Sequence, residues 1–264
     1  MTFPPIRLLG PADLPACSDL GESRDWPREP PKWRLLHEVG RVFGVDAPDG
    51  AGLAAAAVLV SFDGVASISM VLVAPRFERR GLGQAITAQA LAAAGDRVVW
   101  LHASKSGKPL YESMGFQVDG GCQGHAGTFL DDGGPGASPG SLSDVFALDL
   151  RAQGVDRRPL LERLGTPFVV DGGFAFGFDI GHVTVIGPVV ATAEEQAKAL
   201  IRGVARAASG EVRVDPDYRF PALTAWVRER GLVPSAPAPR LVLGGRALPG
   251  DTSMRFAPFT RAVG

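Results

Sequence analysis

A strand that turns directly into a helix is the feature that most restricts the fold of this chain. From Val65 to Val73 the residues fit the two-residue period of a β-strand, in which successive side chains point to opposite faces. From Gly81 to Ala94 the apolar residues Leu82, Ile86 and Ala90 recur every four positions, which predicts a helix with one buried stripe. Between them lies "VAPRFERRGLGQAI" (73–86), with three arginines and two glycines. The pattern predicts an α/β organisation with a short, charged turn at this junction.

Length and charge limit the classes of function. The chain has 264 residues, enough for two ordinary domains, and 45% of them are hydrophobic, as in a globular protein. The formal net charge is −1, so no basic field is available to hold a nucleic acid by its phosphates. We therefore expect no nucleic-acid partner, while the oligomeric state is left open.

Cysteine and histidine usage argues against a metal or a disulfide framework. Cys17 and Cys122 are the two cysteines, too few for either a disulfide scaffold or a thiolate zinc site. The histidines show no metal-ligand spacing, so no metal is expected. The N-terminus lacks a signal-peptide pattern, and the apolar run 54–62 is too short to cross a bilayer. The expectation is a cytoplasmic protein with no membrane partner.

The two halves of the chain share an order of elements. Each is expected to contain paired strands, a long helix, a short strand, a shorter helix ending in glycine, and further strand, which indicates an internal repeat. Gly115 and Gly231 occupy equivalent places. The stretch "DDGGPGASPGS" (131–141) has the composition of a linker or long surface loop, and a helix is expected over 154–165. The predicted domains are 1–132 and 150–264, joined by residues 133–149.

The turn after the first long strand has the properties of an anion site. The first N–H groups of a helix have no partner within it, and together with the helix dipole they favour a phosphate. Glycine lets a ligand approach the backbone, and Arg79 and Arg80 add charged donors. The alternative is an ordinary glycine-containing turn with solvated arginines.

Three phosphate-binding designs compete at this turn. The P-loop pattern fails, because Pro109 follows the Gly107-Lys108 pair. A dinucleotide fold would place a carboxylate at the end of the next strand, which instead ends in Leu101-His102. An acyl-coenzyme A cradle fits the residues best.

The junction resembles the coenzyme A signature of the GNAT N-acetyltransferase superfamily, V-x-P-x-x-[QR]-x-x-G-x-[GA]. Val73, Pro75, Gly81 and Gly83 match it, whereas Glu78 stands where the family has Gln or Arg. A second stretch, "LHASKSGKPLYESMGF" (101–116), resembles the A-[ST]-x-x-G-x-x-L-Y-E-x-x-G-F ending of a subset of these enzymes. The resemblance covers about residues 5–130.

The resemblance implies two GNAT-like domains, each a mixed, mostly antiparallel sheet flanked by helices, with acetyl-CoA as co-substrate. Strand residues 71–73 would pair with the pantetheine arm, and amides from 79 to 84 would hold the pyrophosphate. The residues expected to bind the coenzyme are Val71, Leu72, Val73, Glu78, Arg79, Arg80, Gly81, Leu82, Gly83, Gln84 and Ser104.

Tyr111 matches the tyrosine of the family whose hydroxyl faces the departing thiolate. A phenol with a pKa near ~10 is protonated at neutral pH and can supply the proton that the sulfur needs. A strand N–H near Val71 would stabilise the negative oxygen formed during transfer. The alternative interpretation of Tyr111 is a core aromatic residue on a short helix.

The acceptor site and the general base are less well defined by the sequence. Trp26 and Trp33, in a loop with Asp25 and Glu29, are the candidates for contact with a cationic amine. For Asp25 and Glu29 taken individually, solvated loop charges are the favoured interpretation. The strand before Pro75 carries no carboxylate, and His102 or Asp63 could relay a proton through water. No base is assigned.

The second strand-to-helix junction, "VIGPVVATAEEQAKAL" (185–200), lacks these features. Thr192 and Glu195 fit a capping box, so the chain's own side chains would satisfy the helix N-terminus. Val227 takes the place corresponding to Tyr111. Residues 165–258 resemble the accessory C-terminal domain of some two-domain GNAT proteins, so we expect a degenerate domain that binds no coenzyme.

The leading hypothesis is an acetyl-CoA-dependent N-acetyltransferase that acts on the primary amine of a small molecule by direct attack, with Tyr111 as general acid. A non-catalytic module that binds or senses acyl-CoA is the alternative from another class, and a nicotinamide oxidoreductase is a more distant one. The sequence does not distinguish among acceptor amines or acyl-chain lengths.

Overall fold

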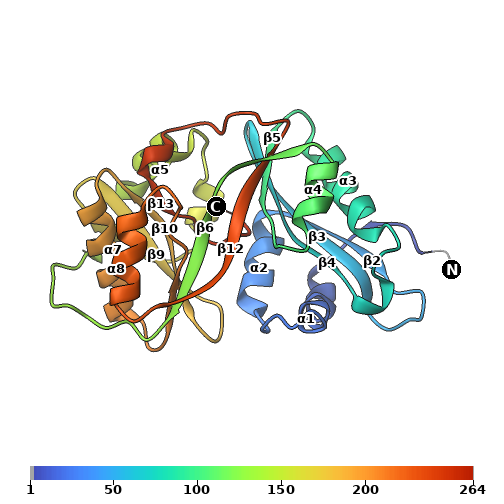
Figure 1. The fold of residues 1–264 in the computed structure, drawn as a ribbon, viewed down its shortest axis with the longest axis horizontal. Coiled ribbons are helices and arrows are strands. Elements are labelled where there is room, and N and C mark those ends of the chain that lie inside the picture. The colour runs from blue at the N-terminus through green and yellow to red at the C-terminus, as the bar shows by residue number, and fades with distance from the viewer. Residues whose placement is uncertain (1–2, 264) are drawn as a thin grey trace. The chain divides into compact units, whose positions relative to one another are not determined.

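A computed structural model describes residues 3–263 and divides into two compact units, the first ending at Leu101 and the second beginning at His102 (Figure 1). The first unit contains β1 (Arg7–Leu8), η1 (Pro11–Asp13), α1 (Leu14–Glu22), α2 (Pro30–Val39), β2 (Arg41–Asp46), β3 (Leu53–Phe62), β4 (Val65–Val73), η2 (Pro75–Phe77), α3 (Leu82–Ala94) and most of β5 (Val98–His102).

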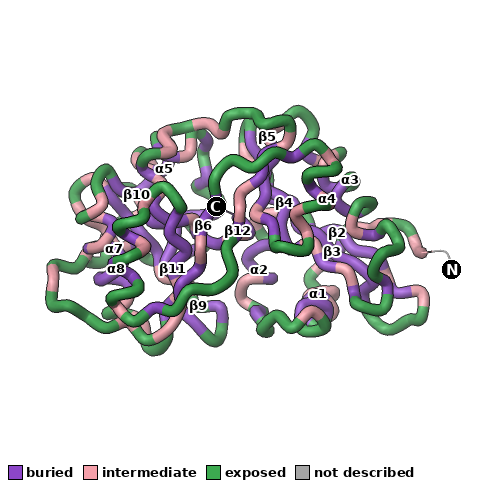
Figure 2. Tube along the Cα trace, viewed as in Figure 1, coloured by how far each residue is buried: buried purple, intermediate pink, exposed green. Residues whose placement is uncertain are grey.

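The sheet of the first unit runs in chain order from β1 to β5. All neighbouring strands are antiparallel except β4 and β5, which are parallel. Helices α1 and α2 cover one face and α3 covers the other, so β3 and β4 are buried along most of their length (Figures 1 and 2). The strand predicted at 65–73 and the helix predicted near 81–94 both form, because each presents its apolar residues to this two-sided core.

The second unit is built around a longer sheet. It contains α4 (Lys108–Ser113), β6 (Phe116–Gly127), β7 (Ser138–Pro139), α5 (Ser143–Gln153), α6 (Arg158–Leu161), β8 (Phe168–Val170), β9 (Gly173–Asp179), β10 (Thr184–Ala191), α7 (Glu194–Ala207), β11 (Val212–Val214), α8 (Pro221–Glu229), β12 (Val233–Leu243), η3 (Thr252–Met254) and β13 (Arg255–Ala257).

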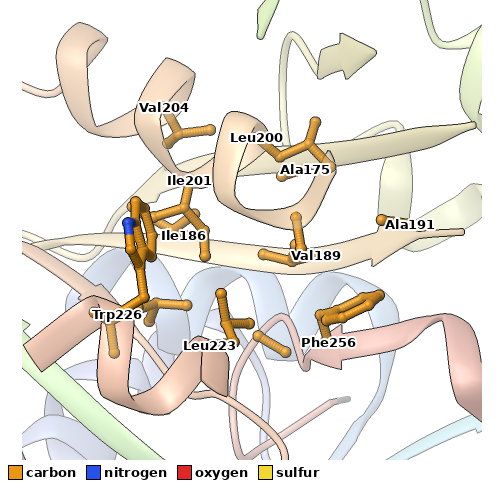
Figure 3. Close-up of a cluster of buried hydrophobic side chains, with 14 of the residues drawn as sticks. Ala175, Ile186, Val189, Ala191, Leu200, Ile201, Val204, Leu223, Trp226 and Phe256 are labelled. Atoms are coloured by element: carbon orange, nitrogen blue, oxygen red, sulfur yellow. The ribbon is translucent and has the colours of Figure 1, made fainter. Parts of the chain in front are cut away.

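The strand order in this unit is β12-β6-β11-β10-β9-β8-β7, with β13 on β10. The β10–β11 pair is parallel and the other pairs are antiparallel. Helices α7 and α8 direct apolar side chains, among them Leu200, Ile201 and Trp226, onto β10 and its neighbours (Figure 3). Both units are therefore mixed, mostly antiparallel sheets flanked by helices, and the predicted fold class is confirmed.

The two long strands β6 and β12 pair along most of their length, although they lie far apart in the sequence. The register shifts between Pro239 and Leu241, where the partner residues on β6 jump from Gly121 to Val118. Arg240 therefore stands at a bulge, opposite Asp119 and Gly120. Because a bulge bends the strand and re-aims its side chains, this position is set by the pairing rather than by the alternation of the sequence.

A buried ion pair joins α5 to the residues before α6. Arg157 donates from Nη2 to Asp149 Oδ1 (2.7 Å) and from Nε to Asp149 Oδ2 (3.1 Å). The two side chains are 3% and 1% exposed. The two charge-assisted hydrogen bonds compensate the cost of removing both charged groups from water.

The region predicted as a linker contains regular structure. Residues 143–149, placed in that linker, form the first part of α5, and Ser138–Pro139 pair with β8 as β7. The helix predicted over 154–165 is limited to α6, because Gly154 ends α5 in a left-handed conformation (φ 68°). The domain limits at 132 and 150 stay a prediction; the compact units divide at residue 101 instead, since β6 is paired with β12. Within residues 3–263, every helix is too short or too polar to span a bilayer.

Candidate functional site

The turn between β4 and α3 has an open, left-handed backbone. Arg79 and Gly81 both have positive φ, 57° and 80°. A Cβ added at Gly81 would meet no atom within 4 Å, so the space beside this backbone is open. Left-handed residues alternating with others turn successive N–H groups to one side, as in anion-binding nests. The residues predicted to hold the pyrophosphate thus form a turn with two left-handed residues that leads into the N-terminus of α3.

The arginines of this turn have different environments. Arg76 is held by Asp49, with Nε 2.8 Å from Oδ2, and it also donates from Nη2 to the Ala51 carbonyl (2.6 Å). Its guanidinium lies over the buried ring of Phe77 (4.6 Å). Arg79 has no ion-pair or hydrogen-bond partner among residues 3–263, and its side chain is exposed. Of these two arginines, Arg76 fixes the turn and Arg79 is available for a ligand.

Glu78 is bound by a side chain from outside the turn. Arg24, which follows α1, donates to its carboxylate. Glu78 stands where the family has Gln or Arg, and this ion pair partly compensates its negative charge beside the turn predicted to bind the pyrophosphate. Glu78 therefore ties the segment after α1 to the turn.

Strand β4 contains a bulge next to the predicted pantetheine-binding residues. The register with β3 passes from Ala56–Leu72 to Val58–Ser69, so Met70 and Val71 together oppose Ala57. Met70 has a positive φ of 49°, which is strained for a residue with a side chain. The parallel pairing with β5 covers only Val65–Ser67. Met70 and Val71 thus interrupt the ladder with β3, which resumes at Leu72 and Val73, and the ladder with β5 has ended before them.

Ser69, immediately before the bulge, has a buried hydroxyl. Its side chain is 8% exposed, and its Oγ has no hydrogen-bond partner within residues 3–263. A buried hydroxyl without a partner is unfavourable, and such groups concentrate at functional positions. No sequence signal distinguishes Ser69 from Ser67, because the bulge that sets its surroundings depends on the register with β3.

Tyr111 lies on α4, in the second unit, with a buried ring. The ring makes an edge contact with Phe116 (6.0 Å between centroids), and Gly107 leaves room for it, since a Cβ there would lie 3.1 Å from Tyr111 Cε2. Burial raises the pKa of Tyr111 to about 12. Its hydroxyl has no hydrogen-bond partner within the described part of the chain. The phenol of Tyr111 is therefore held in place by packing and stays protonated at neutral pH.

Ser104 caps the turn before α4. Its Oγ accepts from the Gly107 N–H (3.1 Å) and lies 3.2 Å from Ser106 Oγ. These contacts position the segment that carries Tyr111. Coenzyme contact by Ser104 stays a prediction.

Both ring nitrogens of His102 are engaged. Nδ1 lies 3.3 Å from the carbonyl oxygen of Arg261, which can only accept, so Nδ1 carries the proton. Nε2 then accepts from the Cys122 thiol (3.6 Å). Burial, followed by the charge of Arg240, lowers the pKa of His102 to about 4. A neutral, doubly engaged imidazole is poorly suited to the base role considered from the sequence, and Asp63 lies in the exposed turn between β3 and β4.

The two candidate acceptor-binding tryptophans differ in exposure. Trp33 is 2% exposed in α2 and packs in the core of the first unit, whereas Trp26 is exposed in the loop before α2. The acidic side chain of Glu29 in the same loop is buried against Lys32 (2.6 Å). Trp26 is the residue of the pair that presents its ring to solvent.

The residues immediately before α7 are held by a side chain of the first turn of that helix. The predicted capping box of Thr192 with Glu195 is wrong, because the side chain that reaches back belongs to Gln196, one residue later. Its Oε1 accepts from the Thr192 hydroxyl (2.7 Å) and from the Ala193 N–H (2.8 Å). Glu194 and Glu195 also bring two negative charges to the first turn of α7, and Lys198 forms an ion pair with each of them. This junction differs from the open turn before α3. No group of three or more metal-ligating side chains occurs within residues 3–263.

Comparison with known proteins identifies the same family in both halves. Two family models described as acetyltransferase (GNAT) domains match residues 50–128 and 145–257. The chain is 27% identical over 228 residues to the uncharacterized N-acetyltransferase YitH of Bacillus subtilis, covering 80% of this chain and 77% of YitH.

Solved structures show the same fold. A protein from Pyrococcus horikoshii, described as a candidate acetyltransferase, has a TM-score of 0.86 at 18% identity and covers 98% of this chain and 95% of its own. A tandem GNAT protein from the clavulanic acid biosynthesis pathway has a TM-score of 0.59 at 16% identity, over 92% and 99% of the two chains. With two matching domains, this chain belongs to the GNAT superfamily of acetyltransferases and is a tandem-domain N-acetyltransferase.

Proposed function

We propose that the chain transfers the acetyl group of acetyl-CoA to the primary amine of a small molecule, using the β4–α3 junction to hold the coenzyme. The observation that carries this proposal is the open turn at residues 79–81, where two left-handed residues precede a helix N-terminus. Backbone N–H groups and Arg79 would receive the pyrophosphate there. The bulge at Met70 and Val71 would supply backbone groups to the pantetheine arm and the thioester.

The chemistry requires one bond to form, one to break and two protons to move. The amine nitrogen attacks the acetyl carbon, and the carbon–sulfur bond breaks. A strand N–H near Val71 donates to the carbonyl oxygen as its negative charge grows. Tyr111 gives its proton to the sulfur, and the amine loses a proton to water. The raised pKa of Tyr111 suits this role, since the phenol is protonated at neutral pH.

The second GNAT domain has a different role in this proposal. At its equivalent junction Gln196 binds the residues that precede the helix, and two glutamates in the first turn would repel a pyrophosphate. We assign coenzyme binding to the first domain alone. The two cysteines are free and buried, which suits a reducing compartment such as the cytoplasm.

Purified full-length chain with acetyl-CoA and a panel of primary amines tests the proposal. Release of free thiol that depends on particular amines, with the acetylated amine found by mass spectrometry, is the expected result. Coenzyme binding without thiol release for any amine would instead favour a non-catalytic acyl-CoA module.

Calorimetry should give one coenzyme A per full-length chain. The expected ratio follows from the difference between the two junctions, since Gln196 binds the residues before α7 and the charges of Glu194 and Glu195 would repel a pyrophosphate there. A ratio of two would contradict the assignment of a degenerate second domain.

Arg79→Gln should weaken coenzyme A binding about tenfold, because one exposed, charge-assisted contact to a phosphate is lost. The turnover number at saturating coenzyme should change little. The matched control is Arg76→Gln in the same turn, whose guanidinium is already bound to Asp49. Calorimetry on both variants is the measurement, and equal losses of affinity would show that Arg79 has no special place.

A further inference from the structure

The segment "RVDPDYR" (213–219) places two buried carboxylates among arginines in the second unit. Each aspartate takes a bidentate partner two residues away. Arg213 binds Asp215 at 2.8 and 2.6 Å. Arg219 binds Asp217 at 2.8 and 2.9 Å. These local pairs already balance both aspartates.

The backbone fixes this segment against β6. Gln123 donates its N–H to the Pro216 carbonyl (3.1 Å), and the Tyr218 N–H donates to Gly121 (2.9 Å). The two carboxylates therefore cannot move freely to serve other partners.

Two further arginines reach the same carboxylates from distant parts of the chain. Arg261 lies with Nε 3.2 Å from Asp215 Oδ2. Arg240 Nη2 donates to the half-exposed Asp119 (3.2 Å). Arg240 Nη1 lies 3.6 Å from Asp217 Oδ2, which is beyond hydrogen-bond length. Its side chain is only 13% exposed, and its Nε has no hydrogen-bond partner among residues 3–263. Counting Asp119, four arginines thus face three carboxylates, and one positive charge is left over.

Glycines and the β6–β12 bulge make room for these guanidinium groups. A Cβ at Gly124 would collide with both Arg261 and Asp215, and one at Gly120 would lie 3.4 Å from Arg240 Nη2. Both arginines lie near His102: Nδ1 of His102 contacts the Arg261 carbonyl, and the Ala103 N–H donates to Pro239, the neighbour of Arg240. His102 and Ala103 immediately precede the segment with Ser104 and Tyr111 that the proposed reaction uses.

We propose that Arg240 binds a carboxylate, and that the acceptor is an amine that also carries a carboxylate; Arg261, whose Nε and Nη2 are taken by Asp215 and Ser235, holds the carboxylate of Asp215. The proposal rests on the proposed function for the identity of the acceptor. A carboxylate would accept from the unused Nε and a terminal N–H of Arg240 in the bidentate manner that guanidinium groups favour, and would balance the surplus charge. A site with such donors discriminates against the matching amide or decarboxylated amine, because the guanidinium would be left without its partner.

The first test is kinetic and uses the full-length chain with α-amino acids, their carboxamides and their decarboxylated amines. The wild type should prefer the carboxylate form of its best acceptor by about 100-fold in kcat/KM, as expected for a buried charged pair. Arg240→Gln should remove most of that preference, whereas Arg240→Lys should restore part of it. Equal use of all three forms by the wild type would overturn the proposal, even if acetyl transfer itself is confirmed.

The second test does not depend on turnover. Small carboxylates without an amine, such as propionate and succinate, should raise the melting temperature of the wild type above that seen with chloride at equal ionic strength, and should do so less in Arg240→Gln. The control is Arg228→Gln, an arginine of the same unit that contacts His125 and Gln123 instead of a carboxylate. An equal response of all three proteins would overturn the site.

A coenzyme phosphate is the competing anion. If Arg240→Gln weakened binding of coenzyme A but not of dephospho-coenzyme A, Arg240 would serve the 3′-phosphate and the carboxylate proposal would be wrong. Equal binding of both coenzymes by Arg240→Gln and wild type is the result expected here.

Discussion

Replacing Tyr111 with phenylalanine is expected to lower kcat by about 10²–10⁴-fold, the usual contribution of a placed general acid. The affinity for coenzyme A should stay close to that of the wild type. The ring, which is buried against Phe116, is retained in the variant, and only the hydroxyl is lost. Steady-state thiol release gives kcat, and calorimetry on the same preparation gives the dissociation constant.

The other tyrosine of the chain provides the matched control. Tyr218→Phe removes a hydroxyl from the same unit, and kcat should change less than about tenfold, below the range of a general acid. Turnover of Tyr111→Phe at the wild-type rate would mean that water or another group protonates the sulfur.

The pH dependence of acetyl transfer follows from the burial of the Tyr111 ring. A pKa of about 12 keeps the phenol of Tyr111 protonated until the solution approaches that value. The wild-type rate at saturating amine should therefore not fall between about pH 7 and pH 10, although an unperturbed phenol would be half ionised at the upper limit.

Arg157→Met is expected to lower the free energy of unfolding by about 3–5 kcal/mol, because it leaves the carboxylate of Asp149 buried without its bidentate partner. Methionine occupies a similar volume, so the loss is mainly electrostatic. Urea unfolding of the full-length variant measures the change.

Two further variants separate the charge from the packing. Arg157→Met combined with Asp149→Leu should recover most of the loss, since an apolar pair needs no compensation. Arg151→Met, which breaks the exposed pair with Asp251, should cost less than about 1 kcal/mol. A loss as large in the double variant as in Arg157→Met would show that shape, not charge, determines the effect.

Much of the first unit could be predicted because its elements are encoded locally. The strand 65–73 has its predicted limits, and the helix at 82–94 starts one residue after the predicted glycine. In the second unit, α5 escaped prediction because residues 131–141 are rich in glycine and proline, which indicates a loop, and the helix follows immediately. The pairing of β6 with β12 could not be predicted from either strand alone, because it joins segments that are distant in sequence.

The site shows the same division between local and long-range information. The glycine at 81 and the tyrosine at 111 were identified from motif spacing. The bulge at Met70 depends on the register between β3 and β4, and the different roles of Arg76 and Arg79 depend on Asp49 in another turn. At the second junction, Glu195 and Gln196 are neighbours with similar chemistry, and only the exact helix start selects Gln196 as the cap.

The pairing of β6 with β12 also has a consequence for biosynthesis. As the nascent chain leaves the ribosome, β6 emerges before residues 128–232, so its edge stays without a partner until the last long strand has been made. An open strand edge is a template for association with other chains. A product that terminates near residue 132 would carry this edge permanently, and we expect it to aggregate rather than to fold as an independent enzyme.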